Sequence, residues 1–286
     1  QYHYISLNSR RMSNLHCYIN KQFLPIEKAG VSVTDLLVQR GYGIFDYLRV
    51  ADNKPLFLED HLERFYNSAN MMRLQVKETK EEVLKIVHEL IKMNHLGYSG
   101  IRLIISGGDS ADGYTIYQPS LLIIQQPLAT PPDSLNLQGI RLASFDYQRQ
   151  LPRVKTTDYL MAIHLQPWMK EQGADDILYY SNGIVRECPR SNFFMIKNGT
   201  LITAVDKMLL GITRKNIIKI ATENNIPVEE RDFTVEELKT ADEAFITSST
   251  KRVTSVRQID DYILPAITEQ SIAFKLFALL KEKELK

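Results

Sequence analysis

The sequence predicts an α+β protein of two domains, and three observations point to that class. Amphipathic helical patterns alternate with strand-like apolar runs in the first half of the chain, most clearly over 59–72 and 79–94. A stretch with two consecutive prolines, "ATPPDSLN" at 129–136, then interrupts the pattern. Beyond it the chain consists mainly of short strand-like runs, joined in part by Asn-Gly turns at 182–183 and 198–199.

These observations set the predicted domain boundaries. We predict a smaller N-terminal α/β domain over 12–128, an interdomain linker over 129–138 and a larger β-rich C-terminal domain over 139–286. Residues 1–11 lie upstream of Met12, either as an upstream extension or as a cloning remnant. We leave them out of the fold prediction.

The N-terminal domain is predicted to contain two hairpins, two helices and a pair of buried strands. In chain order these are a hairpin over 15–26, a hairpin made of 43–50 and 54–58, helices over 59–72 and 79–94, and strands over 99–108 and 119–127. The helix at 79–94 has the clearer start, because Thr79 and Glu82 form a capping-box pattern. Its apolar residues recur at helical spacing and give it one buried face.

The C-terminal domain is predicted to be a run of short strands with helices around it. In chain order its parts are a strand over 139–145, a segment around Lys155 that leads into a helix, short strands between 175 and 203, a helix over 211–225, the stretch 226–233, a helix over 235–241, a strand over 243–250 and a C-terminal helix from about Glu269. The two Asn-Gly pairs are strong hairpin signals, because both residues tolerate positive φ.

Composition and charge exclude several classes of protein. The 286 residues carry a formal net charge of +1, so no strongly basic face is required and no nucleic-acid partner is predicted. The longest apolar runs, such as 120–124, are too short to cross a bilayer. Cys17 and Cys188 lie far apart and have no metal-ligand spacing, so no metal site is predicted. Such low cysteine content, without a signal-peptide core, is typical of a cytoplasmic protein.

Three short stretches carry residue types that do chemistry, and each also has a plainer structural explanation. Lys155, in "RVKTTDYL", becomes a nucleophile if burial lowers the pKa of its amine, or it is a surface charge. Glu187 stands in an alternating strand, where it either pairs with a buried cation or faces solvent. Gly211 and Thr213 begin a helix, which makes either an anion site or an ordinary threonine cap.

Two further stretches contain groups that suit phosphate. Ser248, Ser249 and Thr250 follow an apolar strand and form a run of hydroxyl donors, which is also what a polar turn contains. Arg64, in "HLERF", lies on the helix predicted over 59–72 and offers a bidentate clamp, although an exposed arginine is the plainer explanation.

In their order along the chain these stretches resemble the fold-type IV, or class IV, pyridoxal-phosphate (PLP) enzymes. That family includes branched-chain aminotransferases, D-amino acid aminotransferases and 4-amino-4-deoxychorismate lyases. The resemblance covers roughly residues 16 to 270, and its specific parts are "HLERF..SA", "E...SNFF" and "GITR" with the leucine upstream. It implies a C-terminal domain built like a β-barrel with helices, and a homodimer whose active site is shared across the interface.

The resemblance implies a role for each candidate residue. Lys155 would hold PLP as a Schiff base and move the substrate proton. Tyr159, one helical turn further, would hydrogen-bond the phenolic oxygen of the cofactor, and Glu187 would pair with its ring nitrogen. The residues implied for its phosphate and ring face are Arg64, Ile212, Thr213, Ser248, Ser249 and Thr250 for the phosphate, and Leu209 for the ring.

The chain departs from its relatives where the substrate carboxylate is usually bound. Arg40 replaces an uncharged residue in the segment 35–47, and Arg190 stands where small residues are usual. The segment "ISGGDSADGY" at 105–114 lacks the arginine that many relatives carry there. Arg40 and Arg190 therefore predict a rebuilt carboxylate site, with Arg153 as a third candidate, unless these arginines face solvent or pair with nearby acids.

The leading functional hypothesis is an amino acid aminotransferase that passes the amine to a 2-oxo acid such as 2-oxoglutarate through the pyridoxamine form of the cofactor. D-amino acids are favoured as donors, because the typical branched-chain signatures are absent. A branched-chain L-amino acid aminotransferase and a 4-amino-4-deoxychorismate lyase are the alternatives. A protein that carries the cofactor without turnover is a different class, and it would need no acid partner for the ring nitrogen.

Overall fold

The structure, a computed structural model, describes residues 14–285 and divides into two compact units. The first unit contains the chain up to Thr130 together with Val154–Asp158. The second unit contains Pro131–Arg153 and the chain from Tyr159 onward. The division falls inside the stretch 129–138. Residues 154–158, which the sequence-based boundaries assign to the C-terminal domain, belong to the first unit.

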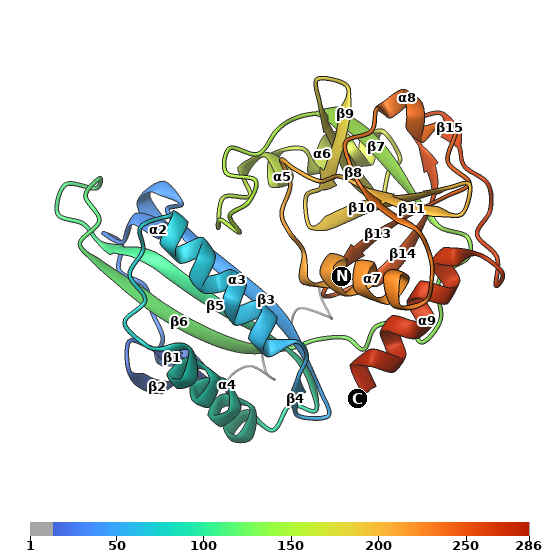
Figure 1. Cartoon of the computed structure of the whole chain (residues 1–286). Coiled ribbons are helices and arrows are strands. Elements are labelled where there is room, and N and C mark those ends of the chain that lie inside the picture. Colours follow the sequence, from blue (N-terminus) through green and yellow to red (C-terminus); the bar gives the residue numbers. More distant parts are fainter. Residues whose placement is uncertain (1–13, 286) are drawn as a thin grey trace. The chain divides into compact units, whose positions relative to one another are not determined.

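The first unit is a six-stranded antiparallel sheet with helices on one face (Figure 1). The strands lie in the order β2-β1-β6-β5-β3-β4. Their bounds are β1 His16–Ile19, β2 Gln22–Pro25, β3 Gly43–Ala51, β4 Lys54–Pro55, β5 Tyr98–Asp109 and β6 Gln118–Pro127. The helices are the 3₁₀ turn η1 Ile26–Lys28, α2 Leu36–Arg40, α3 Leu58–Met71 and α4 Lys80–Asn94.

The core of this unit lies between the sheet and the helices α3 and α4. Alternate residues of β3, such as Ile44 and Leu48, are fully buried on that face, and Phe65 of α3 and Val87 of α4 pack against them. The predicted helix at 79–94 is confirmed, with both capping-box hydrogen bonds between Thr79 and Glu82 in place. The predicted hairpin at 15–26 is also confirmed, as β1 and β2.

The helix α2 is not predicted from the sequence. It is five residues long, which is too short to show a helical repeat. Asp35 caps its start by accepting a hydrogen bond from the Leu37 N–H at 2.7 Å, and Gly41 ends it at a φ of 66°. A cap and a terminal glycine are the signals that could have located it.

The second unit is built around a closed ring of strands (Figure 1). Strands β10, β13, β14, β7, β8 and β9 pair in that order, and β9 returns to pair with β10. The bounds are β7 Ile140–Asp146, β8 Asp176–Ser181, β9 Ile184–Cys188, β10 Ser191–Lys197, β11 Thr200–Thr203, β12 Val228–Glu230, β13 Glu243–Ser248, β14 Arg252–Ile259 and β15 Tyr262–Ile263. The predicted barrel-like C-terminal domain is confirmed.

Five helices of the described chain belong to this second unit. They are α5 Leu160–His164, α6 Gln166–Glu171, α7 Ile212–Glu223, α8 Val235–Leu238 and α9 Ile272–Leu285. Both predicted Asn-Gly turns are present, and Asn182 and Asn198 adopt φ values of 52° and 50°. Strand β14 is not predicted, because its sequence "RVTSVRQI" is largely polar. Within residues 14–285 no helix is long and apolar enough to cross a membrane.

Candidate active site

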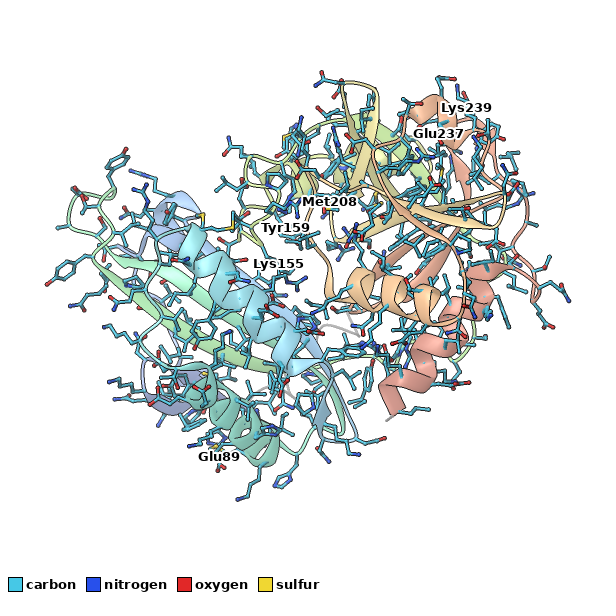
Figure 2. The ribbon with its side chains drawn as sticks, in the orientation of Figure 1. Glu89, Lys155, Tyr159, Met208, Glu237 and Lys239 are labelled. Atoms are coloured by element: carbon cyan, nitrogen blue, oxygen red, sulfur yellow. The ribbon has the colours of Figure 1, made fainter. Side chains whose placement is uncertain are left out.

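Lys155 lies in an extended segment that pairs with β3 in the first unit. The Phe45 N–H donates to the Lys155 carbonyl at 2.9 Å, and the Lys155 N–H donates to Ser68 Oγ of α3 at 3.4 Å. Its ammonium nitrogen lies 4.5 Å from the centroid of the Phe45 ring. Figure 2 shows Lys155 next to α3. Contacts to both the sheet and the helix therefore fix this partly buried lysine.

The sequence predicts that Tyr159 follows Lys155 by one helical turn, and this prediction is wrong. Residues 155–157 are held extended, since Thr156 bridges to Ile44 and the Thr157 N–H donates to the Gly43 carbonyl at 3.0 Å. The helix α5 begins only at Leu160, and Tyr159 is its N-cap residue. Lys155 belongs to the first unit and Tyr159 to the second.

Arg64 lies on α3 and is held by a buried carboxylate. Its Nε donates to Asp46 Oδ2 and its Nη2 to Asp46 Oδ1, both at 2.8 Å. His61 Nδ1 lies 2.6 Å from Asp46 Oδ1. Asp46 and His61 were not predicted as site residues. A charged residue at an inward position of the strand "GIFDYLRV" is the signal that could have found Asp46.

The pKa values of this cluster follow from its charges. Burial raises the pKa of the Asp46 carboxyl, but the charge of Arg64 and the hydrogen bonds from His61 and Arg64 outweigh it and hold the pKa well below its usual range. Burial lowers the pKa of the His61 imidazole, Asp46 opposes that shift, and Arg64 and Lys155 lower it further. The cluster therefore contains an ionised carboxylate, a guanidinium and a neutral imidazole.

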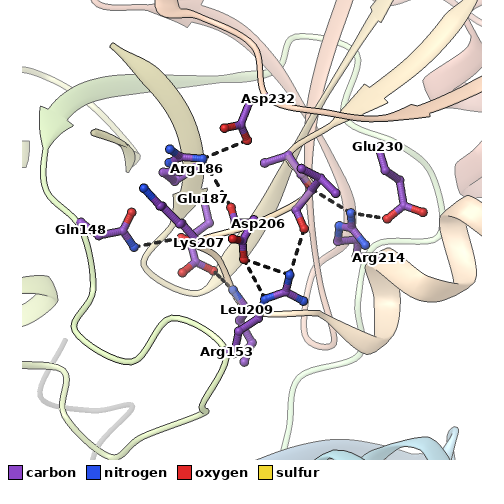
Figure 3. A network of polar contacts seen from close by, with 12 residues as sticks. Gln148, Arg153, Arg186, Glu187, Asp206, Lys207, Leu209, Arg214, Glu230 and Asp232 are labelled. Atoms are coloured by element: carbon purple, nitrogen blue, oxygen red, sulfur yellow. Dashed lines mark hydrogen bonds and ion pairs between the residues drawn. The ribbon is translucent and has the colours of Figure 1, made fainter. Parts of the chain in front are cut away.

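Glu187 lies where the ring of strands closes in the second unit. It sits on β9 opposite Asn192 of β10 and is buried. Its Oε2 accepts a hydrogen bond from the Leu209 N–H at 3.0 Å, and its Oε1 lies 3.5 Å from Arg149 Nε. Figure 3 shows Glu187 and Leu209 within a larger polar network. Arg149 was not predicted, and no local sequence signal marks it.

The segment that follows Leu209 leads into the helix α7. Asn192 Nδ2 donates to the Leu209 carbonyl at 2.7 Å, which fixes the segment on β10. Gly211 is the N-cap residue of α7, and no side chain caps the helix there. Ile212 and Thr213, both buried, form its first turn. A twelve-residue helix thus presents its N-terminal N–H groups beside a fixed loop, which suits an anion.

The hydroxyl loop after β13 belongs to the same unit. Ser248 and Ser249 are partly buried, Thr250 is exposed, and the Ser248 and Thr250 hydroxyls lie 3.4 Å apart. The Thr247 hydroxyl on β13 and the Ser191 hydroxyl on β10 are buried and have no hydrogen-bond partner within residues 14–285. Thr247 pairs with Asn192, and Asn192 pairs with Glu187, so the Thr247 hydroxyl lies on the same face of the sheet as Glu187, whereas Ser191 points to the opposite face. The Thr247 hydroxyl on that face suits a polar ligand.

The candidate carboxylate-binding arginines lie on three different elements. Arg40 is exposed at the C-terminal end of α2, and its Nη1 donates to the Gln39 carbonyl at 3.0 Å. Arg190 is exposed in the turn between β9 and β10. Arg153 forms an ion pair with Asp206 at 2.9 Å. Arg40 belongs to the first unit and the other two to the second.

Two further features of the first unit were not predicted from the sequence. The guanidinium of Arg102, on β5, lies 5.2 Å from the ring centroid of Phe45 and 5.7 Å from that of Tyr47. The loop after β5 is organised by the Asp112 carboxylate, which accepts hydrogen bonds from the Tyr114 and Thr115 N–H groups. This loop is therefore built around an acid, whereas Arg102 shares the Phe45 ring with Lys155. Within residues 14–285 no cluster of metal-ligating side chains is present.

Comparison with known proteins gives a consistent result. The family described as amino-transferase class IV matches residues 43–259. A protein of Methanocaldococcus jannaschii, provisionally named a branched-chain-amino-acid aminotransferase, is 32% identical over 86% of this chain and 88% of its own. The D-alanine aminotransferase of Staphylococcus haemolyticus is 32% identical over 85% and 88%. The branched-chain aminotransferase of Thermoproteus uzoniensis, crystallised with norvaline, has a TM-score of 0.85 at 28% identity and 95% coverage of each chain.

Proposed function

Because this chain belongs to the class IV aminotransferases, we propose that it transfers the amino group of an amino acid, with D-amino acids as preferred donors, to a 2-oxo acid such as 2-oxoglutarate. The family contains PLP-dependent transaminases, and its match together with the relatives named above identifies this chain as one of them. The cofactor supplies an aldehyde and an electron-withdrawing ring that stabilises negative charge at the substrate α-carbon.

The residues present fit this cofactor. It needs an amine for its aldehyde, an acid for its ring nitrogen and donors for its phosphate. Lys155, buried Glu187 and the N-terminus of α7 are proposed as those groups. The observation that carries the fit is the buried Thr247 hydroxyl, which has no partner within residues 14–285 and lies on the same face of the sheet as Asn192 and Glu187. Burial of such groups is costly unless a ligand satisfies them.

Lys155 is proposed as the catalytic residue. Its amine would hold the cofactor covalently through the aldehyde. When free and neutral, the same amine would take the proton from the substrate α-carbon and would return it, as a general base and then a general acid. The backbone pairing with β3 and the contact with Phe45 limit where the amine can move. Tyr159 is proposed to orient the cofactor through its hydroxyl.

Glu187 is proposed to pair with the ring nitrogen and to keep that nitrogen protonated. The hydrogen bond from the Leu209 N–H holds the carboxylate in place, and Leu209 is proposed to pack on the ring. Arg149, near the other carboxylate oxygen, helps to keep Glu187 ionised. Arg64, Ile212, Thr213 and the hydroxyls of Ser248, Ser249 and Thr250 are proposed to bind the phosphate.

The preference for D-amino acids is supported by the D-alanine aminotransferases among the relatives. Arg40 and Arg190 are proposed to bind the substrate carboxylate. A second candidate is a branched-chain L-amino acid aminotransferase. It is supported by the aromatic surface that Phe45 and Tyr47 form around Arg102, which suits an apolar side chain attached to a carboxylate.

A homodimer is the proposed assembly. Symmetric two-fold dimers are the commonest oligomers, and the first unit exposes large apolar side chains around α2 and the loop after β5. Val33, Val38, Tyr114 and Tyr117 are 77%, 57%, 87% and 74% exposed. Light scattering after size-exclusion chromatography tests the assembly, because a monomer at micromolar concentration would contradict it.

The half-reaction tests both the function and its handedness. The purified protein is loaded with PLP, and its absorption spectrum is followed after addition of single amino acids. Conversion to the pyridoxamine form with D-alanine or D-glutamate, but not with L-leucine, supports the proposal. Conversion with L-leucine alone supports the branched-chain alternative. Pyruvate release from aminodeoxychorismate would identify a lyase, and a spectrum that no substrate changes would contradict all three.

A further inference from the structure

A buried ion cluster lies in the first unit, close enough to Lys155 for the lysine charge to act on it. Asp46 of β3 has no exposed side-chain surface, and the Arg64 side chain of α3 is 12% exposed. Two hydrogen bonds of 2.8 Å join the carboxylate to the guanidinium in a bidentate pair. The ring of His61, also on α3 and 2% exposed, contacts the same carboxylate. Burying an ion pair stabilises a fold little, so stability alone does not explain why this cluster is buried.

The contact of His61 assigns its protonation. Nδ1 lies 2.6 Å from Asp46 Oδ1, a separation that two acceptors would not adopt without a proton between them. Nδ1 therefore carries the proton and donates it to Asp46. The Nη2 of Arg64 is 3.4 Å from the same Nδ1, so a further positive charge on the ring would face the guanidinium directly. The geometry thus favours a neutral ring with the proton on Nδ1.

The charges around His61 come from three elements. Asp46 faces it from β3, Arg64 from its own helix, and Lys155 from the extended segment that pairs with β3. Asp46 and Arg64 cancel each other, so the cluster of Asp46, Arg64 and His61 carries no net charge while the ring is neutral. Arg102, whose guanidinium lies over the same Phe45 ring as Lys155, is a separate cation near the lysine. Without Asp46, the guanidinium would stand uncompensated beside the lysine amine.

We propose that Asp46 and His61 are positioning residues for the reaction: Asp46 fixes the guanidinium of Arg64 and the tautomer of His61, and the three residues together carry no net charge. The inference rests on the proposed roles of Lys155 and Arg64. Neither residue needs to touch the substrate. Asp46 sets the direction from which Arg64 meets a phosphate, and the neutral ring of His61 adds no further positive charge near Lys155.

Proton binding to His61 and to Lys155 is therefore coupled, and the coupling is reciprocal. The experiment is nitrogen-15 NMR of histidine in the full chain without cofactor, with the His61 signal assigned from His61→Gln. We expect the Nδ1–H tautomer at neutral pH and an upward shift of the His61 midpoint in Lys155→Met, which removes a nearby cation. Lys80→Met removes a cation from the start of α4 and should leave the midpoint unchanged. An Nε2–H tautomer, or equal midpoints in wild type and Lys155→Met, would overturn the inference.

The positioning of Arg64 is tested separately by cofactor affinity. Asp46→Asn should raise the dissociation constant for PLP by about tenfold or more, since two charge-assisted hydrogen bonds are lost. Glu284→Gln is the matched control. It breaks a similarly buried pair with Arg252, in which the side chains are 3% and 10% exposed, and it should leave the dissociation constant unchanged. Equal affinities in Asp46→Asn and wild type would refute the role of Asp46.

Failure of the proposed function and failure of the positioning roles of Asp46 and His61 give different experimental results. Borohydride reduction of the loaded wild-type protein locates the cofactor, and an adduct on another lysine would refute the proposed function. The NMR coupling between His61 and Lys155 does not depend on that result. If Asp46→Asn does not fold, the NMR measurements on His61→Gln and Lys155→Met still decide the inference.

Discussion

Substitution of Gly211 by alanine isolates one contact of the proposed phosphate site. Gly211 has φ −67° and ψ 142°, values that alanine also adopts, so the backbone imposes no penalty. At such positions Gly→Ala usually stabilises a protein by about 0.4–1 kcal/mol. An added Cβ would, however, meet Asn192 Oδ1 at 2.1 Å, which is shorter than any real contact. Asn192 must therefore move.

The cost follows from what Asn192 does. It is 5% exposed, and its Nδ2 donates to the Leu209 carbonyl at 2.7 Å. Breaking this buried hydrogen bond costs about 1–3 kcal/mol, so the net destabilisation is about 1–2 kcal/mol. For a protein of this size that corresponds to a fall of about 2–8 °C in Tm. The loop from Leu209 to α7 also shifts, so the affinity for PLP should fall.

Thermal unfolding followed by circular dichroism measures the effect, with Gly97→Ala as control. A Cβ at Gly97 meets nothing within 4 Å, so that variant should be as stable as wild type or slightly more stable. In an Asn192→Ala background, Gly211→Ala should cost almost nothing, because the clashing amide is gone. If Gly211→Ala is as stable as Gly97→Ala, the account of this loop is wrong.

Two further predictions concern charge. Glu187→Gln should slow the half-reaction on the order of 100-fold, measured by stopped-flow absorbance, while circular dichroism should show that the fold is retained. An unchanged rate would exclude a role for this carboxylate. The second concerns acid stability. The pKa values of His61 and Asp46 are both lower in the folded chain than in the unfolded chain, so the unfolded chain binds more protons in acid. The free energy of unfolding should therefore decline as pH falls below about 6.5, because of His61, and further below about 4, because of Asp46. Urea unfolding at several pH values should show a flatter decline between pH 6.5 and 5 in His61→Gln, and equal slopes would contradict the assignment.

The elements predicted from sequence are those whose signal is local. The helix α4 has a capping box and a helical apolar repeat, and the Asn-Gly turns at 182–183 and 198–199 need only two residues each. The segment at Lys155 could not be predicted in the same way. It is extended because it pairs with residues 43–45, more than 100 positions earlier, and no local pattern records such a partner.

The residues of the candidate site also differ in whether a local sequence signal marks them. Lys155, Glu187 and the start of α7 stand in motifs that resemble those of a known family, so the sequence could indicate them. Asp46 belongs to none of those motifs, and His61 begins the "HLERF" motif, in which only Arg64 was singled out. The importance of both residues depends on a tertiary contact with Arg64. The closure of the ring by β9 and β10, which places Glu187, is likewise a long-range pairing.

The central claim is that the amine of Lys155 holds the cofactor covalently. The most direct measurement is borohydride reduction of the PLP-loaded protein, followed by proteolysis and mass spectrometry of the labelled peptide. The account predicts one pyridoxyl group per chain, attached to Lys155, and none in Lys155→Ala. A label on a different lysine, or full labelling of Lys155→Ala, would contradict it.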